Sequence, residues 1–161
     1  MRRVALALGL LALGGAWPAL SRDTLGVFGQ WAAFRDGENE RCYAIAEPVS
    51  GDREGAFLSV GYWPQGRISG QVQVRFASAP NPEAPAALAV GETRVPLVIR
   101  GRDGWARTAA DDRRLIAAMR EGRGIGASAR GAAGRRITLG FSLNGAATAI
   151  DAAALGCAAG R

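Results

Sequence analysis

Most of the chain alternates short apolar runs with turn-forming residues, a pattern typical of β-strands. The clearest run covers 68–78, where Val72, Val74 and Phe76 alternate with polar neighbours in the period of two expected of a half-buried strand. Similar runs, bounded by Gly, Pro or Asp-Gly, cover 27–34, 41–46, 56–63, 93–100 and 137–141. Within 93–100, Pro96 predicts an edge strand or a bulge, because proline has no N–H for a central ladder.

Two segments have helical signals. The first covers 109–120, where Thr108 is a suitable N-cap and Gly122 a suitable end. Its first turn holds two acids, Asp111 and Asp112, as suits the positive end of a helix. One of its faces is apolar and consists of Leu115, Ile116 and Met119. We expect this face to lie on the sheet, with Arg113, Arg114 and Arg120 in solvent. A second short helix is expected around 146–154.

Short strands separated by turn signals indicate a mainly β protein, an antiparallel sandwich or barrel with one or two short helices. The Pro-rich segment 79–85 is expected to be a long surface loop. As an interdomain linker it would leave too few residues on each side for an independent core. We therefore expect a single domain over 20–161.

The N-terminus resembles a secretory signal peptide over 1–19. Arg2 and Arg3 precede the apolar run 4–13, and small residues then allow cleavage after Ala16 or, alternatively, after Ala19. The run is short for a membrane span and is followed by polar residues, so a signal is favoured over an N-terminal core helix. This predicts an exported, periplasmic protein with no transmembrane segment in the mature chain.

The composition excludes most common catalytic machinery. The 161 residues contain no His and no Lys, so the 20 basic residues are all Arg. A Ser-His-Asp triad, a His-ligated zinc or haem, a Schiff base and a P-loop lysine are therefore all excluded. We expect no cofactor and no metal. The formal net charge is +6, but the arginines are scattered rather than gathered in a basic run, which argues against nucleic acid as a partner.

The two cysteines, Cys42 and Cys157, lie 115 positions apart, near opposite ends of the expected domain. In an oxidising compartment such a pair is expected to form one structural disulfide, the alternative being two free buried thiols. The spacing differs from the Cys-x-x-Cys of a redox-active pair.

Carboxylates are the remaining candidates for chemistry. Asp111 and Asp112 could form an acid–base pair, but adjacent helical residues point about 100° apart, and both favour the positive helix N-terminus. Glu38 and Glu40 lack the further oxygens of a calcium loop. The run 122–126 resembles a phosphate loop, but it follows a helix instead of preceding one.

Two further groups of residues have a structural and a functional interpretation. Trp31, Trp63 and Trp105 could form an aromatic ligand platform, although core positions are favoured for them in a domain this small. Ser59 and Ser128 have no histidine or lysine available as a base. No constellation in the sequence therefore qualifies as an active site.

The order of several motifs resembles the invasion-associated locus B family of exported bacterial proteins. The matching segments are Phe28-Gly-Gln-Trp31, Arg41-Cys42-Tyr43-Ala44-Ile45-Ala46-Glu47-Pro48, Trp105, Asp111-Asp112 with Leu115 to Gly122, Phe141-Ser142-Leu143-Asn144-Gly145, Ala149-Ile150-Asp151, and Cys157. One position departs, since Arg35 stands where many members have a cysteine. The resemblance implies an immunoglobulin-like β-sandwich in the periplasm or at the outer membrane, and it brings no catalytic residues.

The sequence therefore favours a non-enzymatic protein of the periplasm or envelope that acts through surface contacts with a protein or envelope partner. The family resemblance adds a role in host interaction or envelope function. The alternative is a periplasmic small-ligand-binding module with a groove lined by Trp and Arg. An enzyme restricted to carboxylate chemistry, such as glycoside cleavage, ranks third, because nothing in the sequence indicates two acids at the required separation.

Overall fold

The computed structural model describes residues 22–158, so the expected signal peptide lies outside the described residues. Within this range eleven strands join in one sheet of order β1-β2-β3-β5-β6-β9-β8-β7-β10-β11-β4. The strands are β1 (Arg22–Phe28), β2 (Trp31–Asp36), β3 (Arg41–Ala46), β4 (Ser50–Gly51), β5 (Phe57–Trp63), β6 (Ile68–Arg75), β7 (Ala87–Val90), β8 (Thr93–Arg100), β9 (Asp103–Ala106), β10 (Gly124–Arg130) and β11 (Arg136–Ser142). All ten strand pairings are antiparallel.

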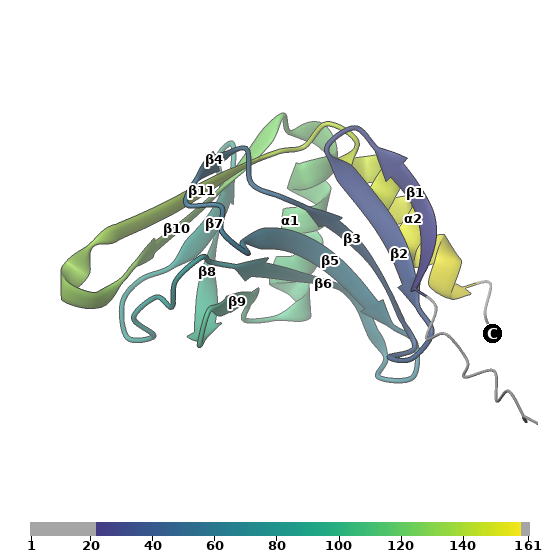
Figure 1. Ribbon diagram of the computed structural model, residues 1–161, viewed down its shortest axis with the longest axis horizontal. Coiled ribbons are helices and arrows are strands. Elements are labelled where there is room, and N and C mark those ends of the chain that lie inside the picture. The colour runs from purple at the N-terminus through teal and green to yellow at the C-terminus, as the bar shows by residue number, and fades with distance from the viewer. Residues whose placement is uncertain (1–21, 159–161) are drawn as a thin grey trace, which may run out of the picture.

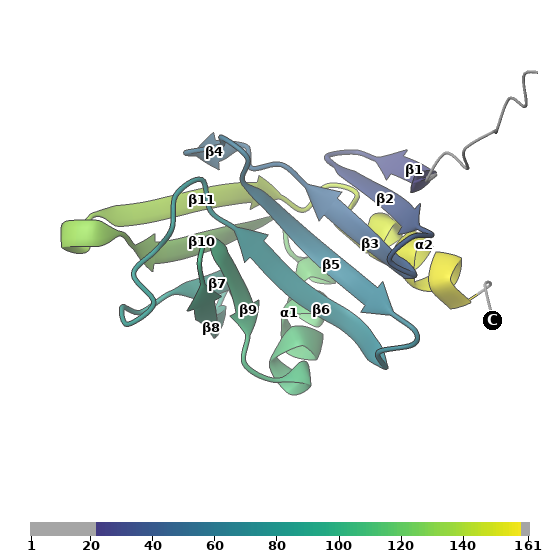
Figure 2. The same ribbon diagram turned by 60° about the horizontal axis from the view of Figure 1, so that its bottom comes forward.

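Two α-helices, α1 (Ala109–Glu121) and α2 (Ala146–Ala158), accompany the sheet. The sheet bends into two layers, β1-β2-β3-β5-β6-β9 and β7-β10-β11-β4, and both helices lie on its inner side (Figures 1 and 2). α2 packs on β1, β2, β3 and β5, whereas α1 packs on β6 to β9. The expectation of a mainly β, sandwich-like antiparallel fold with two helices is confirmed. No helix among the described residues is long and apolar enough to cross a membrane.

The bend between the layers lies in β8, and it corrects the expectation for Pro96. Residues 93–96 of β8 pair with β7, whereas residues 97–100 pair with β9. Pro96 ends the pairing with β7, so its missing N–H falls where the strand changes partner. β8 is thus an interior strand of the sheet with no bulge at Pro96, but Pro96 itself has a neighbouring strand on one side only, as at an edge.

The expected strand 27–34 is wrong in its boundaries. The structure breaks it after Phe28 into the hairpin β1–β2, in which Phe28 faces Trp31 across a turn at Gly29 and Gln30. The apolar pattern runs unbroken through this turn, and only Gly29, at φ 58°, marks it in the sequence.

One contiguous core fills the space between the two layers and the helices. Its largest fully buried side chains are Trp31, Phe76, Phe141, Leu58, Leu88, Leu115, Met119 and Ile150. Alternating residues of paired strands face it; Leu58, for example, lies opposite Val74, and Ala127 opposite Leu139. The segment 79–85 connects β6 to β7 and belongs to no strand or helix, as expected of a loop.

α1 matches its sequence signals closely. The Thr108 hydroxyl accepts the Asp111 N–H at 3.1 Å, which caps the helix, and the Gly122 N–H donates to the Ala118 carbonyl at its end. Leu115 is fully buried and Met119 is 1% exposed, while Ile116 is half-buried. The three arginines expected in solvent are exposed.

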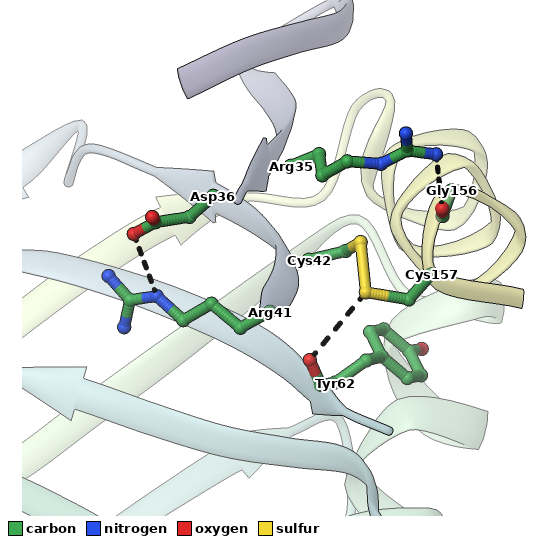
Figure 3. Close-up of a disulfide and its surroundings, with 7 residues drawn as sticks. All are labelled: Arg35, Asp36, Arg41, Cys42, Tyr62, Gly156 and Cys157. Atoms are coloured by element: carbon green, nitrogen blue, oxygen red, sulfur yellow. Dashed lines mark hydrogen bonds and ion pairs between the residues drawn. A yellow bond between two sulfur atoms is a disulfide. The ribbon is translucent and has the colours of Figure 1, made fainter. Parts of the chain in front are cut away.

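The expected Cys42–Cys157 disulfide is present. It links β3 to α2 with a Cα–Cα distance of 5.6 Å (Figure 3). Beside it, the Arg35 guanidinium donates to the Gly156 carbonyl at 2.6 Å. This hydrogen bond is a second link between the sheet and α2, from β2 instead of β3. The Cys157 sulfur also lies 3.9 Å from the Tyr62 carbonyl oxygen. This is a packing contact, since a disulfide sulfur has no hydrogen to donate.

We expect Leu115→Asp to lower the free energy of unfolding by at least about 3 kcal/mol, because it places an unpaired charge in the core. Arg113→Glu, two residues earlier on the exposed face, should stay within about 0.5 kcal/mol of wild type. Urea denaturation followed by circular dichroism measures both values. Equal, small shifts would mean that α1 is not docked on the sheet.

We expect Cys42→Ala/Cys157→Ala to lower the free energy of unfolding by roughly 2–5 kcal/mol, since the bond closes a loop of more than one hundred residues in the unfolded chain. Reduction of the wild-type protein with dithiothreitol should give a similar loss, measured by the same denaturation experiment. A midpoint that is unchanged by reduction would show that α2 is held by packing alone.

Candidate functional site

Two segments that carry the family resemblance meet in space. The indole N–H of Trp31 donates to the Ser142 carbonyl at 2.9 Å, and the Gln30 N–H donates to the Asn144 carbonyl at 3.0 Å. The turn between β1 and β2 is thereby bonded to the segment between β11 and α2 (Figure 1). Trp31 itself is 1% exposed and lies in the core, as its favoured interpretation predicted.

Two glycines make this approach possible. Gly29 and Gly145 have φ values of 58° and 87°, in the left-handed region that disfavours side chains. A Cβ on Gly29 would lie 2.6 Å from the Asn144 carbonyl oxygen, and one on Gly145 would collide with the Phe28 carbonyl. These two motifs therefore describe how the domain closes, and they present no reactive side chain to solvent.

The two acids at the start of α1 have separate structural roles. Asp111 accepts a hydrogen bond from the Thr108 hydroxyl at 2.9 Å and pairs with Arg114 at 3.0 Å on the surface. Asp112 points inward, is 8% exposed, and accepts the Val72 N–H at 2.9 Å. They do not form a catalytic pair. Helix N-terminal placement was predicted for both, but the contact of Asp112 with the sheet was not.

Asp112 occupies a gap in the hydrogen bonding of the sheet. β9 pairs with β6 only from Gln73 onward, so the Val72 N–H lies beyond the end of its neighbour and needs another acceptor. Burial raises the pKa of Asp112, against the lowering effect of the Val72 hydrogen bond, and the nearby Asp111 raises it further. The carboxylate thus completes the sheet but is desolvated in doing so.

The turn after β2 is built around Asp36. Its carboxylate accepts hydrogen bonds from the side chain of Asn39 at 2.8 Å and from its backbone at 3.2 Å, and it pairs with Arg41 at 3.3 Å. The Asn39 amide is the main cause of the lowered pKa of Asp36. Glu38 and Glu40 are exposed beside this turn. Within residues 22–158 no three acidic or cysteine side chains gather as metal ligands would.

The other candidates also occupy structural positions. Gly122 ends α1, whereas Gly124 and Gly126 lie in β10, so the glycine run 122–126 has no phosphate-loop geometry. Ser59 is buried in β5, and Ser128 in β10 accepts a long hydrogen bond of 3.5 Å from Arg94.

Two of the three tryptophans are not core residues, which corrects their favoured interpretation. Trp63 and Trp105 are half-buried on the outer face of the sheet, opposite the helices. The Trp63 ring lies over Gly61, where an added Cβ would be 2.5 Å from it. Because Gly61 has no side chain, the Trp63 indole can lie on the backbone of β5 at that position.

Phe34 and Tyr43 share this outer face, so we call Phe34, Tyr43, Trp63 and Trp105 the outer aromatic row. The Phe34 and Tyr43 ring centroids are 5.6 Å apart, and the Arg41 guanidinium lies 4.9 Å from the Tyr43 centroid. Tyr43 faces Gly61 across β3 and β5, which places it beside the Trp63 ring. In Figure 2 strands β2, β3, β5 and β6 lie in front and both helices lie behind them.

A hollow of about 410 Å³ opens beside Trp105. Its walls are formed by Gln71, Val98, Arg100, Trp105, Ala106 and Arg107. It partly matches the expected groove lined by Trp and Arg, although it contains one tryptophan and is a shallow depression of the sheet surface. Arg100 and Arg107 are exposed, and neither forms an ion pair within the described residues.

A second group of arginines lies at the tip of the β10–β11 hairpin, which projects beyond the rest of the molecule (Figure 1). Arg130 and Arg136 face each other as the last cross-strand pair, and Arg135 lies in the adjoining turn. All three are exposed and form no ion pair in the part of the chain that the structure describes. We call Arg130, Arg135 and Arg136 the hairpin arginines. The sequence pattern did not single them out, because they are scattered until the hairpin folds.

No protein-family model matches the sequence, and a comparison with curated proteins finds no match. A comparison with solved structures does find one. The fold is similar to that of invasion associated protein B from Bartonella henselae. That crystal structure matches with a TM-score of 0.61 and 19% sequence identity, over 80% of this chain and 93% of the other. The resemblance seen in the motifs is thereby supported at the level of the fold.

We expect Asp112→Ala to lower the free energy of unfolding by about 1–3 kcal/mol, because it leaves the buried Val72 N–H without an acceptor. Asp112→Asn keeps an acceptor oxygen without the charge. Since the folded-state pKa of Asp112 is raised, stability is lost as the pH rises from the unfolded-state pKa and the loss is complete above the folded-state pKa.

Asp112→Asn should therefore gain stability relative to wild type as the pH rises from 3 to 7. Denaturation midpoints measured across this range test the sign. A relative loss on raising the pH would show that the charged hydrogen bond outweighs desolvation.

Proposed function

We propose that this protein is an exported, non-enzymatic protein of the bacterial periplasm or envelope that acts by contact with an acidic partner. The hairpin arginines carry the proposal. Like charges directly opposite each other on paired strands destabilise a sheet, and Arg130 and Arg136 occupy such a pair with no carboxylate to relieve it. An acidic surface brought against the hairpin would supply the missing counter-charges.

Other features support this proposal. The 1–19 segment has the pattern of a secretory signal, and its removal takes away Arg2 and Arg3, which lowers the formal net charge from +6 to +4. The remaining positive charge favours approach to acidic surfaces. The similar crystal structure is that of an invasion associated protein, a description compatible with a surface-acting role. The acids with clear structural roles, Asp36, Asp103, Asp111, Asp112 and Asp151, are all engaged by arginines or backbone groups.

The charge-reversal variant Arg136→Glu separates binding from stability. It would face Arg130 as an opposite charge, so we expect the free energy of unfolding to rise by about 0.2–1 kcal/mol. Retention of partners from an envelope extract should fall sharply at the same time. Arg113→Glu changes the net charge equally on α1 and should leave retention unchanged.

Retention by the wild-type protein should also weaken as salt is raised from about 0.05 to 0.5 M, because exposed charges are screened over a shorter distance. If the amount of partner retained changes neither with salt nor with Arg136→Glu, the proposal is contradicted. Turnover of a glycan or ester, lost on replacing one acidic residue, would contradict its non-enzymatic part.

A further inference from the structure

We propose that the outer aromatic row binds an acidic glycan, with its sugar rings laid across Trp63 and Trp105 and a carboxylate held by Arg100 and Arg107. This site is separate from the hairpin arginines and extends beyond the contact function proposed above. Its basis is the register of the sheet, the half-buried indoles on its outer face and the arginines without ion pairs among the described residues.

The register fixes how far apart the two indoles lie. The Trp63 ring covers Gly61, which faces Gln71 on β6. Trp105 faces Gln73, two residues further along β6, and belongs to the next strand. Two strand spacings and a shift of two residues separate Gly61 from Trp105 by about 12 Å. Two aromatic surfaces on one face of a sheet, with room between them, suit an extended ligand better than a compact one.

The side chains between the indoles are polar and uncharged. Gln71 and Gln73 lie half-buried on β6, and Gln73 is oriented by a hydrogen bond of 2.9 Å to Asp103. An amide offers both donors and an acceptor, which matches the hydroxyl groups of a sugar. The partly positive C–H groups of a sugar ring pack on the negative face of an aromatic ring, as Trp63 and Trp105 would present it.

Charge decides between a neutral and an acidic glycan. The nearby acid Asp103 is already bound by Arg75 through two hydrogen bonds, of 2.8 and 2.7 Å. Arg100 and Arg107 line the hollow beside Trp105 and have no ion-pair partner among residues 22–158. A sugar carboxylate in the hollow would accept charge-assisted hydrogen bonds from them. A nucleic acid would call for unpaired basic groups along the whole row. Here Arg41 beside Tyr43 is paired with Asp36, and the arginines without an ion pair in the described part of the chain lie at the two ends, Arg22 beside Tyr43 and Arg100 with Arg107 at the hollow.

The test measures binding of a short oligogalacturonate and of a hyaluronan oligosaccharide to the purified protein by isothermal titration calorimetry. We expect Trp63→Ala and Trp105→Ala each to weaken binding by about fivefold or more, in line with the loss of one stacking surface. Arg100→Ala/Arg107→Ala should weaken it similarly, and methyl-esterified oligogalacturonate, which lacks the charge, should bind more weakly than the acid form.

Gly61→Ala provides a variant that keeps every aromatic residue. Its added methyl group would occupy the position of the Trp63 ring and displace it, so binding should weaken while the fold is retained. Leu155→Ala on the exposed side of α2, Arg123→Ala after α1, and the combined replacement of the hairpin arginines by Ala should bind as wild type.

Three results would overturn the proposal. The first is no binding of either acidic oligosaccharide. The second is binding that the Trp63, Trp105 and Gly61 variants leave unchanged or that the hairpin variant abolishes. The third is tighter binding of a single-stranded oligothymidine, which would make the row a nucleic-acid surface.

Discussion

The buried hydrogen bond from the Trp31 indole to the Ser142 carbonyl joins the first hairpin to the last strand, and much of the architecture depends on it. A buried indole needs an acceptor for its N–H, and the Ser142 carbonyl supplies it where the β11–α2 connection passes the β1–β2 turn. Gly29 and Gly145 allow that passage because neither has a side chain. Once it forms, α2 lies against β1, β2 and β3, which brings Cys157 to Cys42.

The elements that the sequence predicted well are those in which local preference and tertiary placement agree. β6 has strict alternation and α1 has both caps, so each was located within a few residues. β10 was missed because its sequence, Gly-Ile-Gly-Ala-Ser-Ala-Arg, has little strand preference and is held by β7 and β11 on either side. The outer positions of Trp63 and Trp105 were missed for another reason, since periodicity alone does not say which face of a strand is covered.

Most acids with a defined contact bind arginines or backbone groups that stabilise the fold. Many arginines therefore have no acidic partner among the described residues and lie exposed on the surface. Asp103 holds Arg75, Asp151 holds Arg120 across the two helices, and Asp112 completes the edge of β6. Five of the arginines without such partners gather at two places that folding creates, three at the hairpin tip and two at the hollow beside Trp105. A chain with no lysine and no histidine thus acquires two distinct cationic surfaces from residues that are dispersed in the sequence.

The packing of α2 on β1, β2 and β3 also governs the order in which the domain can be completed. β1, β2 and β3 emerge before α2 during synthesis, and α2, which covers their inner face, follows only after β11. Contacts of such high sequence separation slow folding, because a long loop must close before any of them forms. The apolar faces of these three strands stay uncovered until α2 has been made, so they are exposed to mispairing with other chains during that time. For the export proposed above, a chain of this design gains from reaching its final compartment before it folds.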